Sequence, residues 1–127
     1  MMYNVILKLS VFVIVLSFFS CKKSEPPIVN CLKGKLVLQG ICMNYVIEIT
    51  EGSIDTTLYE TKWTNPMNGV EFKNVFALGS ICTFPPNIKE GDSFYFKVLK
   101  SRPDATCVNC KAYSPTPNKS LYIEICN

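Results

Sequence analysis

The chain has 127 residues, of which 48% are hydrophobic, and its formal net charge is +3. This length predicts a single domain. The charge is too small and too evenly spread to argue for nucleic acid or an acidic substrate, and we expect no nucleic-acid partner. The chain contains no histidine. Serine or cysteine nucleophiles activated by histidine are therefore excluded, as is the commonest general base. The composition argues against an enzyme without excluding one, and we expect no cofactor.

The first twenty residues have the pattern of a secretory signal peptide. Lys8 is the one cation, and it is followed by an apolar run over residues 9–19 that only two serines interrupt. Such a run is too short to cross a bilayer comfortably, but it is typical of a signal-peptide core. We therefore predict a lipoprotein signal peptide over residues 1–20, a lipidated cysteine and tether over 21–30, and one β-domain over 31–127.

The end of the leader, Phe18-Phe19-Ser20-Cys21, resembles a lipobox, the motif that lipoprotein signal peptidase recognises. The resemblance implies cleavage before Cys21 and attachment of diacylglycerol to its thiol. Further acylation, as with palmitate, would make the anchor stable, because one acyl chain alone binds a membrane only marginally. The alternative is a plain secretory leader in which Cys21 is incidental.

The tether begins Cys-Lys-Lys-Ser-Glu-Pro-Pro, which is similar to the start of lipoproteins of the Bacteroidota. This resemblance covers the leader and tether only. Many of those lipoproteins lie in the outer membrane, so it implies an outer-membrane lipoprotein that faces the periplasm or the cell surface. We expect its partners to be the membrane and an envelope protein or glycan.

Six cysteines remain besides Cys21. An even number in a small exported domain predicts disulfides, because cross-links that restrict the unfolded chain compensate for a thin core. The sequence leaves the pairing open. The predicted disulfide cysteines are Cys31, Cys42, Cys82, Cys107, Cys110 and Cys126.

The first part of the domain has the sequence pattern of β-strands. Residues 35–39 are rich in β-formers, and residues 42–50 continue that pattern with Tyr45, Ile47 and Ile49 on one face. We predict one long strand that bends at Gly40, because a hairpin at this point would need more turn residues. Residues 54–63 fit either a short strand or one or two helical turns.

The later strands have clearer signals. Asn68-Gly69 ends a loop over residues 65–69 and is the strongest short hairpin signal, so a strand is expected over 70–78. Residues 93–100 alternate most regularly, with Phe94 and Phe96 on one side. Residues 121–126 predict a final strand.

Between these last two strands lies Cys107-Val108-Asn109-Cys110, the one motif with redox or metal spacing. A reactive pair usually opens a helix that lowers the thiol pKa, but Pro115 leaves hardly one helical turn here. Zinc would need ligands beyond one such pair, and histidine is absent. We predict structural disulfides and no metal site; the alternative is a thiol-redox or metal-handling module that uses Cys107 and Cys110.

About five strands and no long helix predict an all-β domain. Closing the sheet into a barrel would remove exposed strand edges, so we expect a small, OB-like barrel that disulfides cross-link. The alternative is a β-sandwich. Tyr59, Trp63 and Tyr113 are candidate ligand contacts, because exposed aromatic rings stack on sugars or partners; the alternative is that the core needs them. The function we infer is a non-enzymatic, membrane-anchored envelope lipoprotein with a binding or structural role.

Overall fold

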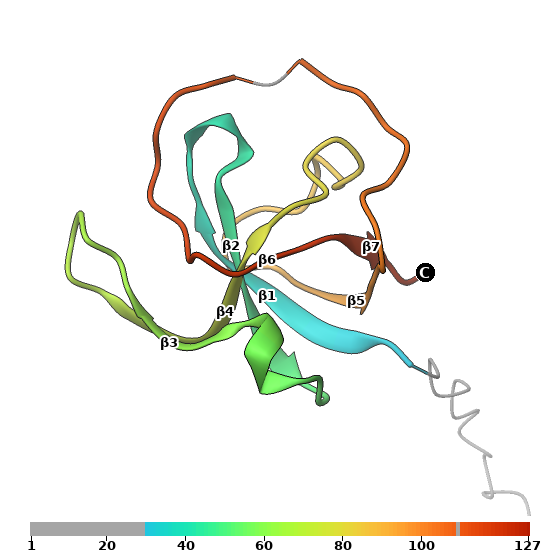
Figure 1. The fold of residues 1–127 in the computed structure, drawn as a ribbon, viewed down its shortest axis with the longest axis horizontal. Coiled ribbons are helices and arrows are strands. Elements are labelled where there is room, and N and C mark those ends of the chain that lie inside the picture. Colours follow the sequence, from blue (N-terminus) through green and yellow to red (C-terminus); the bar gives the residue numbers. More distant parts are fainter. Residues whose placement is uncertain (1–29, 109) are drawn as a thin grey trace, which may run out of the picture.

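A computed structural model of the chain describes residues 30–108 and 110–127 (Figure 1). The predicted signal peptide, Cys21 and nearly all of the tether lie outside these residues. The prediction of an all-β domain is confirmed: the described part contains strands and two short 3-10 turns, η2 (Ile41–Met43) and η3 (Thr56–Leu58), and no α-helix.

The strands form one sheet. Its main path runs in the order β3-β4-β2-β1-β5-β7, with antiparallel neighbours throughout, and β6 lies off this path and pairs with β4 in parallel. The strands are β1 (Leu32–Gln39), β2 (Tyr45–Glu51), β3 (Glu60–Thr64), β4 (Glu71–Leu78), β5 (Ser93–Val98), β6 (Ser120–Leu121) and β7 (Ile123–Ile125).

The predicted long strand bent at Gly40 is wrong. β1 and β2 are two strands of an antiparallel hairpin, joined by a tight turn over residues 40–44. Cys42 and Met43 at its centre both have positive φ, 57° and 56°, and Asn44 N donates to Ile41 O at 3.1 Å. Glycine or asparagine usually occupies such positions, so a Cys-Met pair gave no turn signal. We call this segment the β1–β2 turn.

The count of about five strands is also corrected, for two reasons. The ambiguous stretch before the Asn-Gly loop contains β3, which pairs with β4 through Trp63 and Phe72 among others. The final strand is divided at Tyr122, because its first part pairs with β4 and its second part with β5. The hairpin predicted at Asn68-Gly69 is confirmed, and Gly69 has a φ of +72° there.

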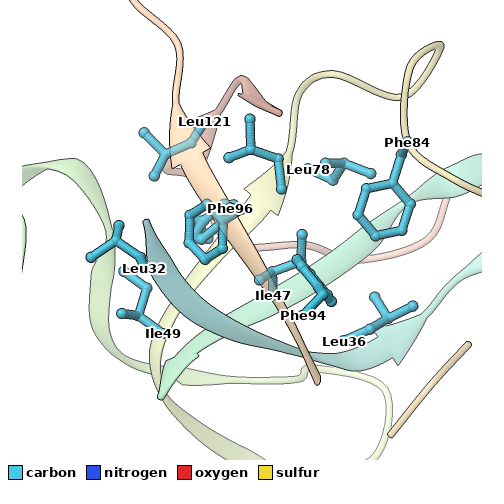
Figure 2. Packing of buried hydrophobic residues seen from close by; sticks show 11 residues of the cluster. Leu32, Leu36, Ile47, Ile49, Leu78, Phe84, Phe94, Phe96 and Leu121 are labelled. Atoms are coloured by element: carbon cyan, nitrogen blue, oxygen red, sulfur yellow. The ribbon is translucent and has the colours of Figure 1, made fainter. Parts of the chain in front are cut away.

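The core lies on one face of the curved sheet. Figure 2 shows its side chains pointing toward one another from β1, β2, β4 and β5, with Phe84 reaching in from the β4–β5 connection. Phe96 lies at the centre of this cluster, with its ring centroid 5.7 Å from that of Phe76 and 6.0 Å from that of Phe94. The strand predicted over residues 93–100 ends at Val98, and its alternation is confirmed, because Phe94 and Phe96 are buried while Tyr95 is exposed.

A buried serine fastens the last strand to the end of β4. The Ser80 hydroxyl donates to Ile123 O and accepts from Ile123 N, both at 2.9 Å. Two backbone hydrogen bonds precede this contact along the chain: Ala77 N donates to Lys119 O and Gly79 N donates to Leu121 O, each at 2.8 Å. The chain from 119 to 123 therefore follows β4 and its extension, and this path carries the preceding loop back across the domain.

Candidate functional site

The six cysteines form three disulfides, as predicted. Cys31 is bonded to Cys126, with a Cα–Cα distance of 6.6 Å, and so joins the two ends of the described domain. Cys107 and Cys110 are bonded to different partners, Cys82 at 5.4 Å and Cys42 at 5.3 Å between Cα atoms. The CxxC motif therefore supplies two separate cross-links, and both fasten the connection between β5 and β6.

That connection, residues 99–119, is named here the β5–β6 loop. It contains no helix or strand in the part that the structure describes, and it arches over the β1–β2 turn and the β4–β5 connection (Figure 1). The Cys42–Cys110 disulfide joins the loop to the β1–β2 turn, and the Cys82–Cys107 disulfide joins it to the β4–β5 connection. In the described part of this loop, no helix terminus stands beside Cys107 or Cys110 to stabilise a thiolate.

Three contacts hold the β1–β2 turn against the β5–β6 loop. The first is the Cys42–Cys110 disulfide. The second is a hydrogen bond from Asn44 Nδ2 to Ala112 O at 3.3 Å; the same amide group also donates to Ile41 O at 2.8 Å. The third is close packing, because a Cβ atom at Gly40 would collide with the Ser114 hydroxyl. Together they restrict the relative motion of the two segments.

Beside this junction the surface is hollowed. Two open hollows, with volumes of about 480 and 580 Å³, share Asn44, Leu78, Tyr113 and Ser114 in their walls. The first extends along Met43 and Lys111, and the second extends along Thr116, Asn118 and Ser120. Because they share walls, we treat them as one groove, bounded by the β1–β2 turn, the end of β4 and the β5–β6 loop.

The three aromatic residues predicted to contact a ligand do not lie together. Tyr113 lines both parts of the groove and is 80% exposed. Trp63 is half-buried on the β3–β4 hairpin, where its ring stacks on Phe72 with centroids 5.8 Å apart. Tyr59 packs against the core. Of the three, only Tyr113 is placed to meet a ligand in the groove.

The groove has the chemistry of a binding surface. Its walls carry hydroxyl and amide groups, an exposed phenol ring and the Lys111 ammonium group, and no carboxylate among the described lining residues. Perturbed titration is found elsewhere: a hydrogen bond to Glu51 raises the pKa of Lys33, and the Thr57 N–H lowers the pKa of Asp55. Lys33 is partly buried and Asp55 is exposed. A raised lysine pKa and a lowered aspartate pKa keep both groups in their ordinary charged form at neutral pH, so neither is prepared for proton transfer.

Sequence reasoning missed the groove residues other than Tyr113, namely Asn44, Lys111 and the hydroxyl side chains of the loop. One local signal was available, because residues 99–119 hold four cations and one acid, whereas the whole chain is nearly balanced. Among the described residues, no group of three or more His, Cys, Asp or Glu side chains gathers as a metal site would require.

No described helix has the length and apolarity needed to cross a bilayer. Cys21, the predicted lipidation site, lies outside the described residues. Comparisons of the chain with protein families, with curated proteins and with solved structures found no match.

Proposed function

We propose that this protein is a membrane-anchored envelope lipoprotein whose β-domain binds an envelope component in the groove beside Tyr113, without catalysing a reaction. The observation that carries the binding role is an aromatic ring, 80% exposed, on a loop that a disulfide and a hydrogen bond hold in place. A preformed site loses little conformational entropy when it binds, so this rigidity favours affinity.

The anchoring part of the proposal is supported by the leader and by Cys21 within the lipobox-like sequence. The polar tether that follows separates the acyl chains from the domain, which begins at Cys31. The similarity of this tether to lipoproteins of the Bacteroidota supports a place in the outer membrane, facing the periplasm or the cell surface. The three disulfides agree with an oxidising compartment outside the cytosol.

We also propose that the sheet is an OB-like, partly open barrel. The pairing of β6 with β4 and of β7 with β5 supports this arrangement, since β6 and β7 belong to one terminal segment. The hydrogen bonds of Ala77, Gly79 and Ser80 to that segment support it further. In OB-folds, the loops corresponding to the β1–β2 turn and the β5–β6 loop flank the binding face, which binds oligonucleotides or oligosaccharides.

The cysteine pairing supports the binding role over the thiol-redox or metal-handling alternative. Cys107 and Cys110 are bonded to Cys82 and Cys42 and not to each other, so a two-electron exchange within the CxxC pair has no disulfide to act on. Metal binding would require thiolates that these bonds remove.

Cys21→Ser tests the anchor. Without the thiol no diacylglycerol can be attached, so we expect the protein to leave the membrane fraction or to accumulate as uncleaved precursor. Cell fractionation and the mass of the N-terminal peptide measure the result, and Ser24→Ala in the tether is the control that should remain membrane-bound. A wild-type protein found soluble with an unmodified N-terminus would contradict the proposal.

Tyr113→Ala tests the groove. Full-length, lipid-modified protein in nanodiscs is mixed with envelope fragments from cells that lack it, and the bound fraction is measured by sedimentation. Loss of the exposed ring should weaken binding about tenfold, the effect of losing an aromatic contact of ordinary strength. Tyr95→Ala is the matched control, because Tyr95 is exposed on β5 and lines neither part of the groove. Failure of wild-type protein to bind, or equal loss in both variants, would overturn the binding role.

A further inference from the structure

The charges of the described domain are unevenly distributed, which corrects the even spread inferred from the sequence. The β5–β6 loop carries Lys100, Arg102, Lys111 and Lys119 against one acid, Asp104, whereas the rest of the described domain carries more acids than cations. The ion pairs within residues 30–108 and 110–127 join Lys33 to Glu51, Lys62 to Glu71 and Lys97 to Glu124, each at 2.8 Å. None of the loop's cations takes part in these pairs, so their charge is available to a partner.

Two of these cations border the groove. Lys111 lines it beside Tyr113. Lys119 is not part of the wall, but it is exposed and lies in the chain between Asn118 and Ser120, which line the other end. The backbone of Lys119 is fixed beside β4, because its carbonyl accepts a hydrogen bond from Ala77 N at 2.8 Å. No described wall residue is acidic. An anionic ligand in the groove would therefore meet Lys111 in the wall, the exposed Lys119 next to the wall residues of the other part, and no carboxylate of the wall.

The remaining groups of the groove distinguish among anionic ligands. A docked peptide helix or strand needs several apolar anchors or an open strand edge, and single-stranded nucleic acid needs a series of stacking platforms. The groove offers one exposed ring, flanked by hydroxyl and amide side chains such as Ser114, Thr116 and Asn118. This combination suits a sugar, whose flat C–H face packs on an aromatic ring while its hydroxyls exchange hydrogen bonds with polar side chains.

We propose that the groove binds an acidic oligosaccharide. A sugar ring stacks on Tyr113, and the acid groups of the chain meet Lys111 and Lys119. This inference rests on the proposed binding function of the groove and specifies its ligand class. The Cys42–Cys110 disulfide fastens the backbone next to Lys111 and Tyr113, so less conformational entropy of the loop is lost on binding.

The test uses full-length, lipid-modified protein in nanodiscs on an array that carries uronate, sialate and sulfated oligosaccharides, each beside its neutral parent. For the best acidic ligand, affinity is then measured by calorimetry. We expect the neutral parent to bind at least about tenfold more weakly, and binding to weaken as salt is added, because exposed charges are screened. Tyr113→Ala, and separately Lys111→Gln with Lys119→Gln, should each lower the affinity about tenfold.

The matched control is Lys35→Gln with Lys73→Gln, which removes the same charge from exposed positions on β1 and β4. It should leave the affinity unchanged, and equal melting temperatures verify that all variants are folded. Absence of binding to every acidic glycan, equal binding of the neutral parents, or equal loss in the control would overturn the inference. If no acidic glycan binds but envelope fragments still bind through Tyr113, the proposed binding function is retained and an acidic oligosaccharide is rejected as the ligand. Competition by an acidic peptide or single-stranded DNA would then identify the ligand class.

Discussion

Replacement of the Cys31–Cys126 disulfide by two serines is expected to lower the free energy of unfolding by about 4–5 kcal/mol, the largest effect of any single cross-link in this domain. The bond closes a loop with a sequence separation of 95, which removes much of the entropy of the unfolded chain. It also holds the start of β1 near the end of β7, two strands that are separated in the sheet by β5. Since small domains are stable by only about 5–15 kcal/mol, the variant is expected to be marginal.

Equilibrium unfolding in urea measures this effect, with Cys82→Ser and Cys107→Ser as the comparison. That second disulfide has a sequence separation of 25, so the same entropy argument gives about 3–4 kcal/mol for its removal. The expected order of stability is wild type, then the variant without Cys82–Cys107, then the variant without Cys31–Cys126. A reversed order would show that native contacts at the loop, and not the entropy of the unfolded chain, determine the contribution of each bond.

Phe96→Ala is expected to lower the free energy of unfolding by about 3–5 kcal/mol. The Phe96 side chain is fully buried at the centre of the core, against Phe76 and Phe94. It also occupies the space left by the absent side chain of Gly34, where a Cβ atom would lie 2.8 Å from the Phe96 ring. The strands on either side are paired within the sheet, so they are expected to fill the cavity only in part.

The control for this variant is the next residue on β5. Tyr95 points to the opposite face and is 41% exposed, so Tyr95→Ala should cost less than about 1 kcal/mol, as surface substitutions do. Both variants are compared with wild type by urea unfolding under oxidising conditions, so that the disulfides remain intact. A similar loss in the two variants would mean that the interior is not organised around Phe96.

Features that depend on neighbouring residues were predictable from the sequence. The alternation of Phe94, Tyr95 and Phe96 predicts a strand with one buried face, because side chains in a strand point alternately to its two sides. Asn68-Gly69 predicts the β3–β4 hairpin, because these residues adopt turn conformations at little cost. Three disulfides were predicted from an even number of cysteines behind a predicted export signal, and the structure contains them. In each case the information lies within a short stretch or in the composition.

The pairing of strands and cysteines was decided only by the tertiary structure. Whether the chain turns back at residues 40–44 depends on the pairing of β1 with β2 and on the Cys42–Cys110 bond, which stabilise a conformation that Cys42 and Met43 rarely adopt by themselves. The split of the last strand at Tyr122 depends on which strand each half meets.

The candidate site was likewise decided by the tertiary structure. By itself, the sequence determined that the domain is all-β and that it contains three disulfides, and it offered Tyr113 as one of three aromatic candidates. The groove arises because the β5–β6 loop returns across the domain and is cross-linked to the β1–β2 turn, which brings Asn44 beside Tyr113 although 68 residues separate Asn44 from Ala112, its hydrogen-bond partner. Contacts over such separations depend on the whole chain, because the free energy that fixes them comes from the core and the disulfides together.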